Sequence, residues 1–290
     1  IVRDWRDELR EQLVKRHGEE AGLKLADCYG RALPAGYIEE VSPGIAATDV
    51  EHLAALTGPD DLRLSLYRSR RKDGGLRFKL YRQLDDIPLS DALPMMENMG
   101  LRVISEHPYK VDAASGLAYI QDFEVESLQG ELEVDAIDED FEDAFARVWR
   151  GEAENDGFNR LILTAGLSWR QVAMLRSYCK YLLQVGVPFS QSYMEATLAR
   201  YPLLARLLVE LFEARFDPRT GSESDAEIKR GMSRFGAQLK SLSADDEAAM
   251  TALMSVVEAR AKGRDVQVEA ARNALLGLMD RVSSLDEDRI

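Results

Sequence analysis

Side chains that could bind a metal or act in catalysis are few and scattered in this chain of 290 residues. The three histidines, His17, His52 and His107, have no second ligand at the spacing that metal sites use. The two cysteines, Cys28 and Cys179, are far apart in sequence. We therefore predict no metal site, and we interpret each histidine as a surface or structural residue.

No residue stands out as a nucleophile. Ser-His-Asp and Cys-His sites are assembled by folding, so spacing along the chain neither predicts nor excludes one. Cys179 falls on the apolar face of a predicted helix, where a small buried thiol is expected. We predict no catalytic residue in this segment.

Glycine patterns that bind nucleotides are also missing. No G-x-G-x-x-G occurs, and the pair Gly231 and Gly236 lies in a helical pattern and is followed by Ala-Gln. Gly74 and Gly75 precede Lys79, but a hairpin turn accounts for both glycines. Lys79 is then expected on the polar face of a strand. We predict no cofactor-binding residue in this segment.

Residues 131–143 contain eight carboxylates. They lack the glycine and the fixed spacing of a calcium-binding hand. We interpret them as a solvated acidic turn before a helix whose buried face holds Phe141, Phe145 and Val148. The alternative is a site for a cation or a basic partner.

Bulk composition excludes several classes of partner. The formal net charge of −14 repels phosphate backbones and argues against nucleic acid. No apolar run approaches the roughly 20 residues that span a bilayer, and no signal peptide is recognisable, so no membrane partner is predicted. Two lone cysteines fit free thiols in a reducing compartment, which predicts a cytoplasmic protein. Both ends of the chain lack a natural start or stop, so we expect a piece of a longer protein.

Two amphipathic strands are the clearest structural signal. Residues 62–69 carry apolar side chains at 62, 64 and 66, and residues 76–81 carry them at 76, 78 and 80. Strict alternation is typical of strands that are half buried. The Asp-Gly within Lys72–Gly75 provides the positive φ of a tight turn, so a β-hairpin is predicted.

A helix and two further strands follow. The helix runs to about Asn98, with Asp91 as its cap and Pro94 in its first turn, and Gly100 ends it. The strands are expected at 101–107 and at about 117–126.

The remaining sequence is helical. A lead-in over residues 1–60 includes a short helix at 48–56, capped by Thr48 or Asp49. From residue 157 the pattern predicts an antiparallel helical array, with a capping box at Ser168-Trp-Arg-Gln171. We predict three domains, a helical lead-in (1–60), an α+β module (61–152) and an α-helical domain (153–290).

The segment from Leu80 to Ile104 resembles an ACT domain, the amino-acid-sensing regulatory module. This resemblance implies a ferredoxin-like antiparallel sheet flanked by helices. It also implies a possible effector loop formed by Asp85, Asp86, Pro88, Leu89 and Ser90. The family has a glycine where this chain has Leu89, which shifts the expectation from ligand sensing towards domain packing. The strand at 62–69 is expected to replace the module's missing last strand, antiparallel beside the strand at 76–81.

Over its whole length the chain resembles the middle of the large bacterial NAD-specific glutamate dehydrogenases. The resemblance is carried by Leu76-Arg-Phe-Lys-Leu-Tyr81, Leu93-Pro-Met-Met-Glu-Asn-Met-Gly-Leu-Arg-Val103, Phe158-Asn-Arg-Leu-Ile162, Trp169-Arg-Gln-Val172, Ser177-Tyr-Cys-Lys-Tyr-Leu182 and Ser284-Leu-Asp-Glu-Asp-Arg-Ile290.

This resemblance implies a non-catalytic regulatory or structural segment that precedes the catalytic domain. The parent enzyme would convert L-glutamate, NAD and water to 2-oxoglutarate, ammonia and NADH, with NAD bound outside this segment. The implied partners are its own catalytic domain and neighbouring subunits of a homo-oligomer. Two alternatives remain, a free-standing ACT-type protein that senses an amino acid and an enzyme whose site forms only when the helical region folds.

Overall fold

The computed structural model describes residues 4–69, 75–128, 132, 134, 137–218 and 247–290. The chain divides into two compact units. Unit 1 comprises Ile1–Leu93 and Arg102–Glu126, and unit 2 comprises Pro94–Leu101 and Ser127–Ile290. Among the described residues, no helix is both long and apolar enough to cross a bilayer.

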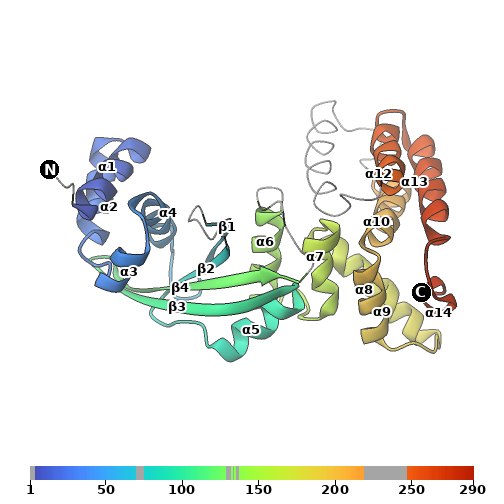
Figure 1. The fold of residues 1–290 in the computed structure, drawn as a ribbon, viewed down its shortest axis with the longest axis horizontal. Coiled ribbons are helices and arrows are strands. Elements are labelled where there is room, and N and C mark those ends of the chain that lie inside the picture. The colour runs from blue at the N-terminus through green and yellow to red at the C-terminus, as the bar shows by residue number, and fades with distance from the viewer. Residues whose placement is uncertain (1–3, 70–74, 129–131, 133, 135–136, 219–246) are drawn as a thin grey trace. The chain divides into compact units, whose positions relative to one another are not determined.

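A four-stranded antiparallel sheet forms the centre of unit 1 (Figure 1). Its strands are β1 (Arg63–Arg68), β2 (Leu76–Gln83), β3 (Leu101–Ala113) and β4 (Gly116–Ser127), in the spatial order β1-β2-β4-β3. β1 lies antiparallel beside β2. The expectation that this strand takes the place of a ferredoxin-like last strand is therefore confirmed, and so is the predicted α+β fold class.

The strand register separates the side chains into two faces. Leu66 lies opposite Phe78, and Phe78 lies opposite Phe123, so one face is apolar and buried. On the other face Lys79 lies opposite Asp122. Side chains alternate along a strand, so Lys79 and Asp122 share the second face with Tyr81 and Ile120.

Helices of the lead-in cover this second face. They are α1 (Trp5–His17), α2 (Glu19–Tyr29), α3 (Ala35–Glu40) and α4 (Pro43–Ala54). α4 contacts β1 and β2 (Figure 1). The shared core contains the helix residues Leu9, Leu13, Tyr29, Leu33, Tyr37, Ala46, Val50 and Leu53 and the strand residues Tyr81, Tyr109, Val111 and Ile120. The sheet of unit 1 is thus covered by its own N-terminal helices.

Two helix starts differ from the sequence-based prediction. α4 begins at Pro43, not near Thr48, because proline fits the first turn of a helix and Ser42 precedes it in an extended conformation. α5 (Leu89–Asn98) begins before Asp91, and Pro94 lies inside it. The Pro88 carbonyl accepts the first bonds of this helix, from the amides of Asp91 and Ala92. Asp91 is therefore not the cap.

β3 is six residues longer than predicted, since it continues past His107 to Ala113. Pro108 lies within it. β3 is at the edge of the sheet, where a strand can lack one N–H donor. Gly100 ends α5 with a φ of 88°, as predicted.

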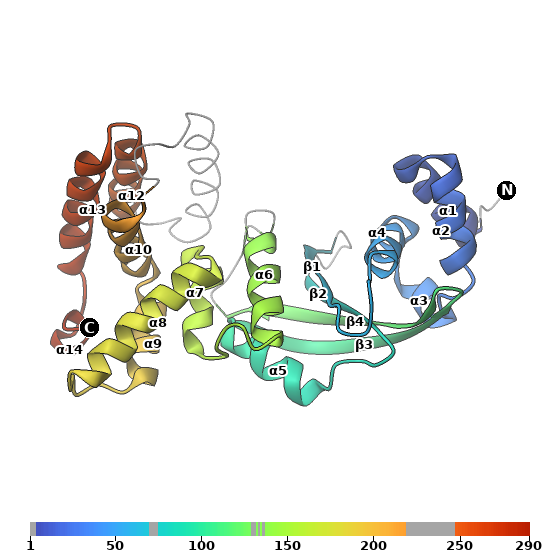
Figure 2. The same ribbon diagram turned by 180° about the vertical axis from the view of Figure 1, so that it is seen from behind.

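Unit 2 is mostly helical (Figure 2). Its helices are α6 (Asp138–Trp149), the 3-10 turn η2 (Gly157–Asn159), α7 (Arg160–Ala165), α8 (Trp169–Gln184), α9 (Gln191–Arg200), α10 (Pro202–Phe216), α12 (Glu247–Arg260), α13 (Arg264–Met279) and α14 (Leu285–Asp288). The predicted capping box of Ser168 and Gln171 is present at α8. Phe141, Phe145 and Val148 of α6 are buried, as expected.

The last helices of unit 2 have a core of their own. α10 and α12 both pack against α13. Their buried residues are Leu207, Leu253, Val256, Val257, Ala271, Ala274 and Leu278. The predicted hairpin turn at 72–74, most of the acidic segment 131–136 and the predicted helical stretch 223–246 lie outside the described residues. The predicted domain boundaries remain predictions.

Candidate functional site

A buried ion pair joins α4 to the sheet of unit 1. Lys79 Nζ lies 2.6 Å from Asp49 Oδ2, and the two side chains are 0% and 2% exposed. Asp49 also accepts hydrogen bonds from the hydroxyls of Tyr81 (2.8 Å) and Tyr37. Asp122 Oδ2 lies 3.7 Å from the same ammonium group. Every charge in this cluster therefore has an opposite charge or a hydroxyl donor beside it.

Electrostatics keep this cluster in one protonation state. Burial opposes the charged form of Lys79, but the Asp49 and Asp122 carboxylates outweigh it, and the pKa of Lys79 is raised. Burial and then Asp49 raise the pKa of both Tyr37 and Tyr81 well above the usual value. At neutral pH the lysine is an ammonium ion and both phenols are donors. A protonated lysine is no nucleophile, so the cluster is suited to binding α4 to the sheet and not to covalent chemistry.

This cluster corrects two sequence-based expectations. Lys79 was expected on an exposed polar face, but α4 covers that face. Asp49 was one of two candidate helix caps, but it lies inside α4. A signal for its burial does exist in the sequence. Asp49 is three residues after Ala46 and four before Leu53, so it shares the helix face on which both of these residues are buried.

A polar pocket of about 340 Å³ lies beside the ion pair, on the same face of the sheet. It is lined by Glu40, Val41, Ile45, Tyr67, Ser69, Gly75, Arg77, His107, Tyr109, Asp122 and Glu124. At its base Arg77 forms a bidentate ion pair with Asp122, with Nε to Oδ1 at 3.0 Å and Nη2 to Oδ2 at 2.9 Å. Planar bidentate pairing fixes the direction of the guanidinium group.

The rim of this pocket brings together a serine, a histidine and two carboxylates. His107 Nδ1 lies 3.4 Å from Glu40 Oε2, and His107 Nε2 lies 3.4 Å from Ser105 Oγ. Ser105 donates its proton to Glu124 Oε2 at 2.9 Å, a shorter contact than the one to His107. The serine proton therefore points away from the histidine, and this arrangement does not activate Ser105 as a nucleophile.

The predicted effector loop lies at the start of α5. Asp85, Asp86, Pro88, Leu89 and Ser90 are all exposed. Ile87, between them, is buried and held by the Gln121 amide, which accepts from the Ile87 N–H (2.8 Å) and donates to the Ile87 carbonyl (2.9 Å). The structure places Asp85, Asp86 and Pro88 in the segment before α5, and Leu89 and Ser90 in its first turn. Binding of an effector there remains a prediction.

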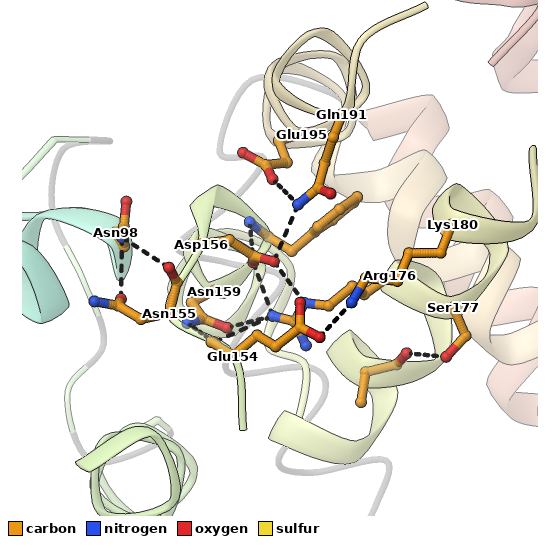
Figure 3. A network of polar contacts seen from close by, with 12 residues as sticks. Asn98, Glu154, Asn155, Asp156, Asn159, Arg176, Ser177, Lys180, Gln191 and Glu195 are labelled. Atoms are coloured by element: carbon orange, nitrogen blue, oxygen red, sulfur yellow. Dashed lines mark hydrogen bonds and ion pairs between the residues drawn. The ribbon is translucent and has the colours of Figure 1, made fainter. Parts of the chain in front are cut away.

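Unit 2 contains a second buried charge, Arg176 of α8 (Figure 3). Its guanidinium group forms a bidentate pair with Asp156, at 2.7 and 2.8 Å, and also donates to Asn159 Oδ1 at 2.9 Å. Asp156 Oδ1 accepts the Phe158 amide at 3.1 Å and so caps η2. The network ties the turn at η2 to α8.

Other polar residues extend this network. Gln191 of α9 donates to Asp156 at 3.3 Å and to Glu195 at 2.8 Å. Asn98 donates to Asn155 Oδ1 at 3.0 Å. We interpret the network as a structural clamp. The sequence did not single out Arg176, because it lies between the buried residues of an apolar helix face.

An apolar pocket of about 390 Å³ is also present in unit 2. It is lined mainly by aliphatic, methionine and aromatic side chains of α8, α9 and α10, and Cys179 is among them. Cys179 is buried, as predicted, and burial raises the pKa of its thiol. The thiol is therefore poorly suited to be a nucleophile.

The spatial order of the strands in unit 1 is that of an ACT-type sheet in which β1 takes the place of the last strand, and helical regions flank it in the sequence. Three family models match the chain accordingly. Residues 12–56 match "Glutamate dehydrogenase, helical motif 2", residues 61–137 match "Glutamate dehydrogenase, ACT3 domain", and residues 153–218 match "Glutamate dehydrogenase, helical motif 3". The expected ACT-type module is thereby confirmed.

Curated relatives agree with these models. The chain is 45% identical over 220 residues to an NAD-specific glutamate dehydrogenase of Halomonas elongata, a match that covers 75% of this chain and 14% of the relative. Proteins of the same name from Pseudomonas aeruginosa and Mycobacterium tuberculosis are 38% identical over 217 residues and 34% identical over 269 residues. These two matches cover 74% and 89% of this chain, and 13% and 16% of the relatives.

The chain thus spans about one seventh of the length of the curated relatives it matches. It belongs to the family of these large glutamate dehydrogenases and contains their ACT3 domain with helical motifs 2 and 3.

Proposed function

We propose that this chain is a non-catalytic regulatory and structural segment of an NAD-dependent glutamate dehydrogenase. The parent protein would convert L-glutamate, NAD and water to 2-oxoglutarate, ammonia and NADH. The observation that carries the structural part is the pair of Asp49 and Lys79. Asp49 lies in helical motif 2, and Lys79 lies in the ACT3 domain.

A buried ion pair across two sequence motifs makes them move together. Breaking such a pair leaves an uncompensated buried charge, which costs about 3–5 kcal/mol. Separating α4 from the sheet would expose Lys79, Asp49 and the core that they share with Tyr81. This argues for a rigid connector that holds its partners at a fixed distance.

The partners in this proposal are the protein's own catalytic domain and neighbouring subunits of a homo-oligomer. NAD would bind in the catalytic domain. The free thiols of Cys28 and Cys179 fit the cytoplasmic location that we propose.

An amino-acid sensor is the second candidate function. It is favoured by one observation, which is that the residues from Asp85 to Ser90 are exposed except for Ile87. Calorimetric titration of the chain with a panel of amino acids separates the two candidates. Saturable binding that is lost in Asp85→Asn or Asp86→Asn favours the sensor, and absence of heat favours the connector.

The proposal as a whole is tested in two assays. We expect the purified 290-residue chain to show no NAD reduction with L-glutamate, and activity above background would contradict the non-catalytic assignment. In the full-length protein, Lys79→Met is expected to lower the dehydrogenase activity or to change its oligomeric state. Lys110→Met, at an exposed position of β3, is the matched control and should change neither.

A further inference from the structure

We propose that the apolar pocket of unit 2 binds an aliphatic carboxylate, an ion with a hydrocarbon chain and one anionic end. The pocket has a volume of about 390 Å³, and all the residues that line it belong to unit 2. They come from α8, α9 and α10, together with Ile290. This inference concerns unit 2 alone and does not depend on the dehydrogenase reaction.

Three helices form the pocket. α8, α9 and α10 each contact the other two (Figure 2). The base of the pocket is formed by Leu175 and Cys179 of α8 and by Met194 of α9, all three of which are buried. Its volume falls within the range of roughly 300–1,000 Å³ that is typical of sites for small molecules. The helices therefore leave a hollow of the size that a small ligand needs.

The walls of the pocket favour a hydrocarbon chain as the body of the ligand. The described side chains that line it are aliphatic, methionine or aromatic, apart from Cys179 and Arg215. Leu182, Leu198 and Leu211 are only half-buried, so part of their apolar surface remains in contact with water. Each methylene group of a ligand that packs against such a wall also leaves water, which strengthens binding. An aliphatic chain thus matches the walls.

One side of the pocket combines aromatic rings with a positive charge. The rings of Tyr178 and Phe212 meet edge to face, with their centres 6.0 Å apart, and the centres of the Phe212 and Phe216 rings are 5.0 Å apart. Arg215 Cζ lies 5.7 Å from the centre of the Phe216 ring. Arg215 is the only charged side chain among the described residues that line the pocket. The polar end of a ligand would therefore meet a cation.

Arg215 is also available to an anion. Arg200 of α9 pairs with Glu287. Arg206 of α10 pairs with Glu210. In contrast, Arg215 is exposed and forms no ion pair with any residue in the described part of the chain. A guanidinium group binds a carboxylate through two parallel hydrogen bonds, so a carboxylate is the head group that this position fits.

Equilibrium dialysis of the 290-residue chain with three probes tests the choice of ligand. The probes are n-octanoate, n-octanol and n-octylamine at neutral pH, which share one hydrocarbon chain and differ in the charge of the head group. We expect saturable binding of one octanoate per chain and at least tenfold weaker binding of the alcohol and of the amine. Absence of saturable octanoate binding, or equal binding of octylamine, would overturn the proposal.

A variant of Arg215 tests the position of the head group. Arg215→Met removes the charge and keeps an apolar stem, so octanoate binding should weaken about tenfold while octanol binding stays unchanged. Arg170→Met is the matched control, because Arg170 is exposed on α8 outside the pocket and also lacks an ion pair with any described residue. It should change neither affinity. Equal losses of octanoate binding in both variants would show that only the net charge matters, and the proposed site would be wrong.

A variant of Leu182 tests the position of the hydrocarbon chain. Leu182→Trp narrows the pocket and should weaken octanoate and octanol binding alike, whereas Leu183→Trp, at an exposed neighbouring position outside the pocket, should weaken neither. Unchanged octanoate binding in Leu182→Trp would overturn the proposal. So would a dimer in sedimentation experiments that excludes octanoate, because the pocket would then belong to a contact with a second copy of the chain. These readouts are binding and mass, so failure here leaves the proposed function untouched.

Discussion

Lys79 of β2 and Asp49 of α4 form a contact of 2.6 Å between two side chains that solvent does not reach. Their residues are 30 positions apart in the sequence and belong to two separately recognised motifs of the same family. The contact converts a helical lead-in and an ACT-type sheet into one body, because neither motif can leave the other without exposing a charge from the core.

Removal of the Lys79 charge is expected to destabilise the folded chain strongly. Lys79→Met leaves the Asp49 carboxylate buried with only hydroxyl donors, which should lower the free energy of unfolding by about 3–5 kcal/mol. Urea denaturation followed by circular dichroism measures this change. The control Lys110→Met removes a charge from the surface and should stay within about 0.5 kcal/mol of the parent chain. Similar losses in the two variants would show that the burial of Lys79 is unimportant.

Alkaline pH should lower the stability of unit 1. Lys79, Tyr37 and Tyr81 all have a pKa raised by folding, so the folded state holds their protons more tightly than the unfolded chain does. Their contribution is complete below the unfolded pKa values of about 10 and is lost as pH rises through the folded values. Unfolding free energies measured between neutral pH and about pH 11 should therefore fall above about pH 10. The fall should be shallower in Lys79→Met, which lacks one of the titrating groups, and an identical slope would contradict this explanation.

The buried charge of Arg176 should be as important for the stability of unit 2 as that of Lys79 is for unit 1. Asp156→Asn keeps the shape of the side chain but leaves the buried guanidinium group with only the half-exposed Glu154 carboxylate, at 3.7 Å, and we expect a loss of about 3 kcal/mol. Hydrogen exchange of the α8 and α9 amides reports on this unit directly. Asp280→Asn changes an acidic residue of unit 2 that forms no ion pair with any residue that the structure describes, and it should leave the exchange rates unchanged. Equal protection in both variants would refute the clamp.

The packing of α1 on α2 depends on a glycine. A Cβ atom added at Gly22 would lie 2.5 Å from the Val14 Cα atom, a backbone atom that cannot move aside easily. Gly22→Ala is therefore expected to destabilise the chain by about 1–3 kcal/mol in spite of the better helix propensity of alanine. At Gly36 of α3 no atom lies within 4 Å of the added Cβ, so Gly36→Ala should be neutral or stabilising by up to about 1 kcal/mol. Thermal unfolding of the two variants measures this difference. Stabilisation by Gly22→Ala would mean that α1 and α2 are further apart than the structure shows.

Local patterns predicted much of this fold correctly. Alternation placed β1 and β2, Gly100 ended α5, and the capping box placed the start of α8. These signals depend on neighbours within a few residues. The replacement of the last sheet strand by β1 was also predictable, because a hairpin partner must lie beside β2.

Other features depend on contacts between segments that are distant in the sequence. For these features the sequence-based prediction was wrong, or no prediction was made. Lys79 has the alternation of an exposed residue, and only the packing of α4 makes it buried. Arg176 lies in an apolar helix face, but its partner Asp156 is 20 residues earlier, in a turn. The polar pocket joins α3 to all four strands, so no single stretch of sequence reveals it.

A double-mutant cycle between Asp49 and Lys79 tests the central claim most directly. The unfolding free energies of Asp49→Leu, Lys79→Met and the double variant are compared with that of the parent chain. If the pair joins the two motifs, each single variant leaves a buried charge that the double variant lacks, and the coupling energy should be about 2 kcal/mol or more. Additive losses, with a coupling below about 0.5 kcal/mol, would contradict the account.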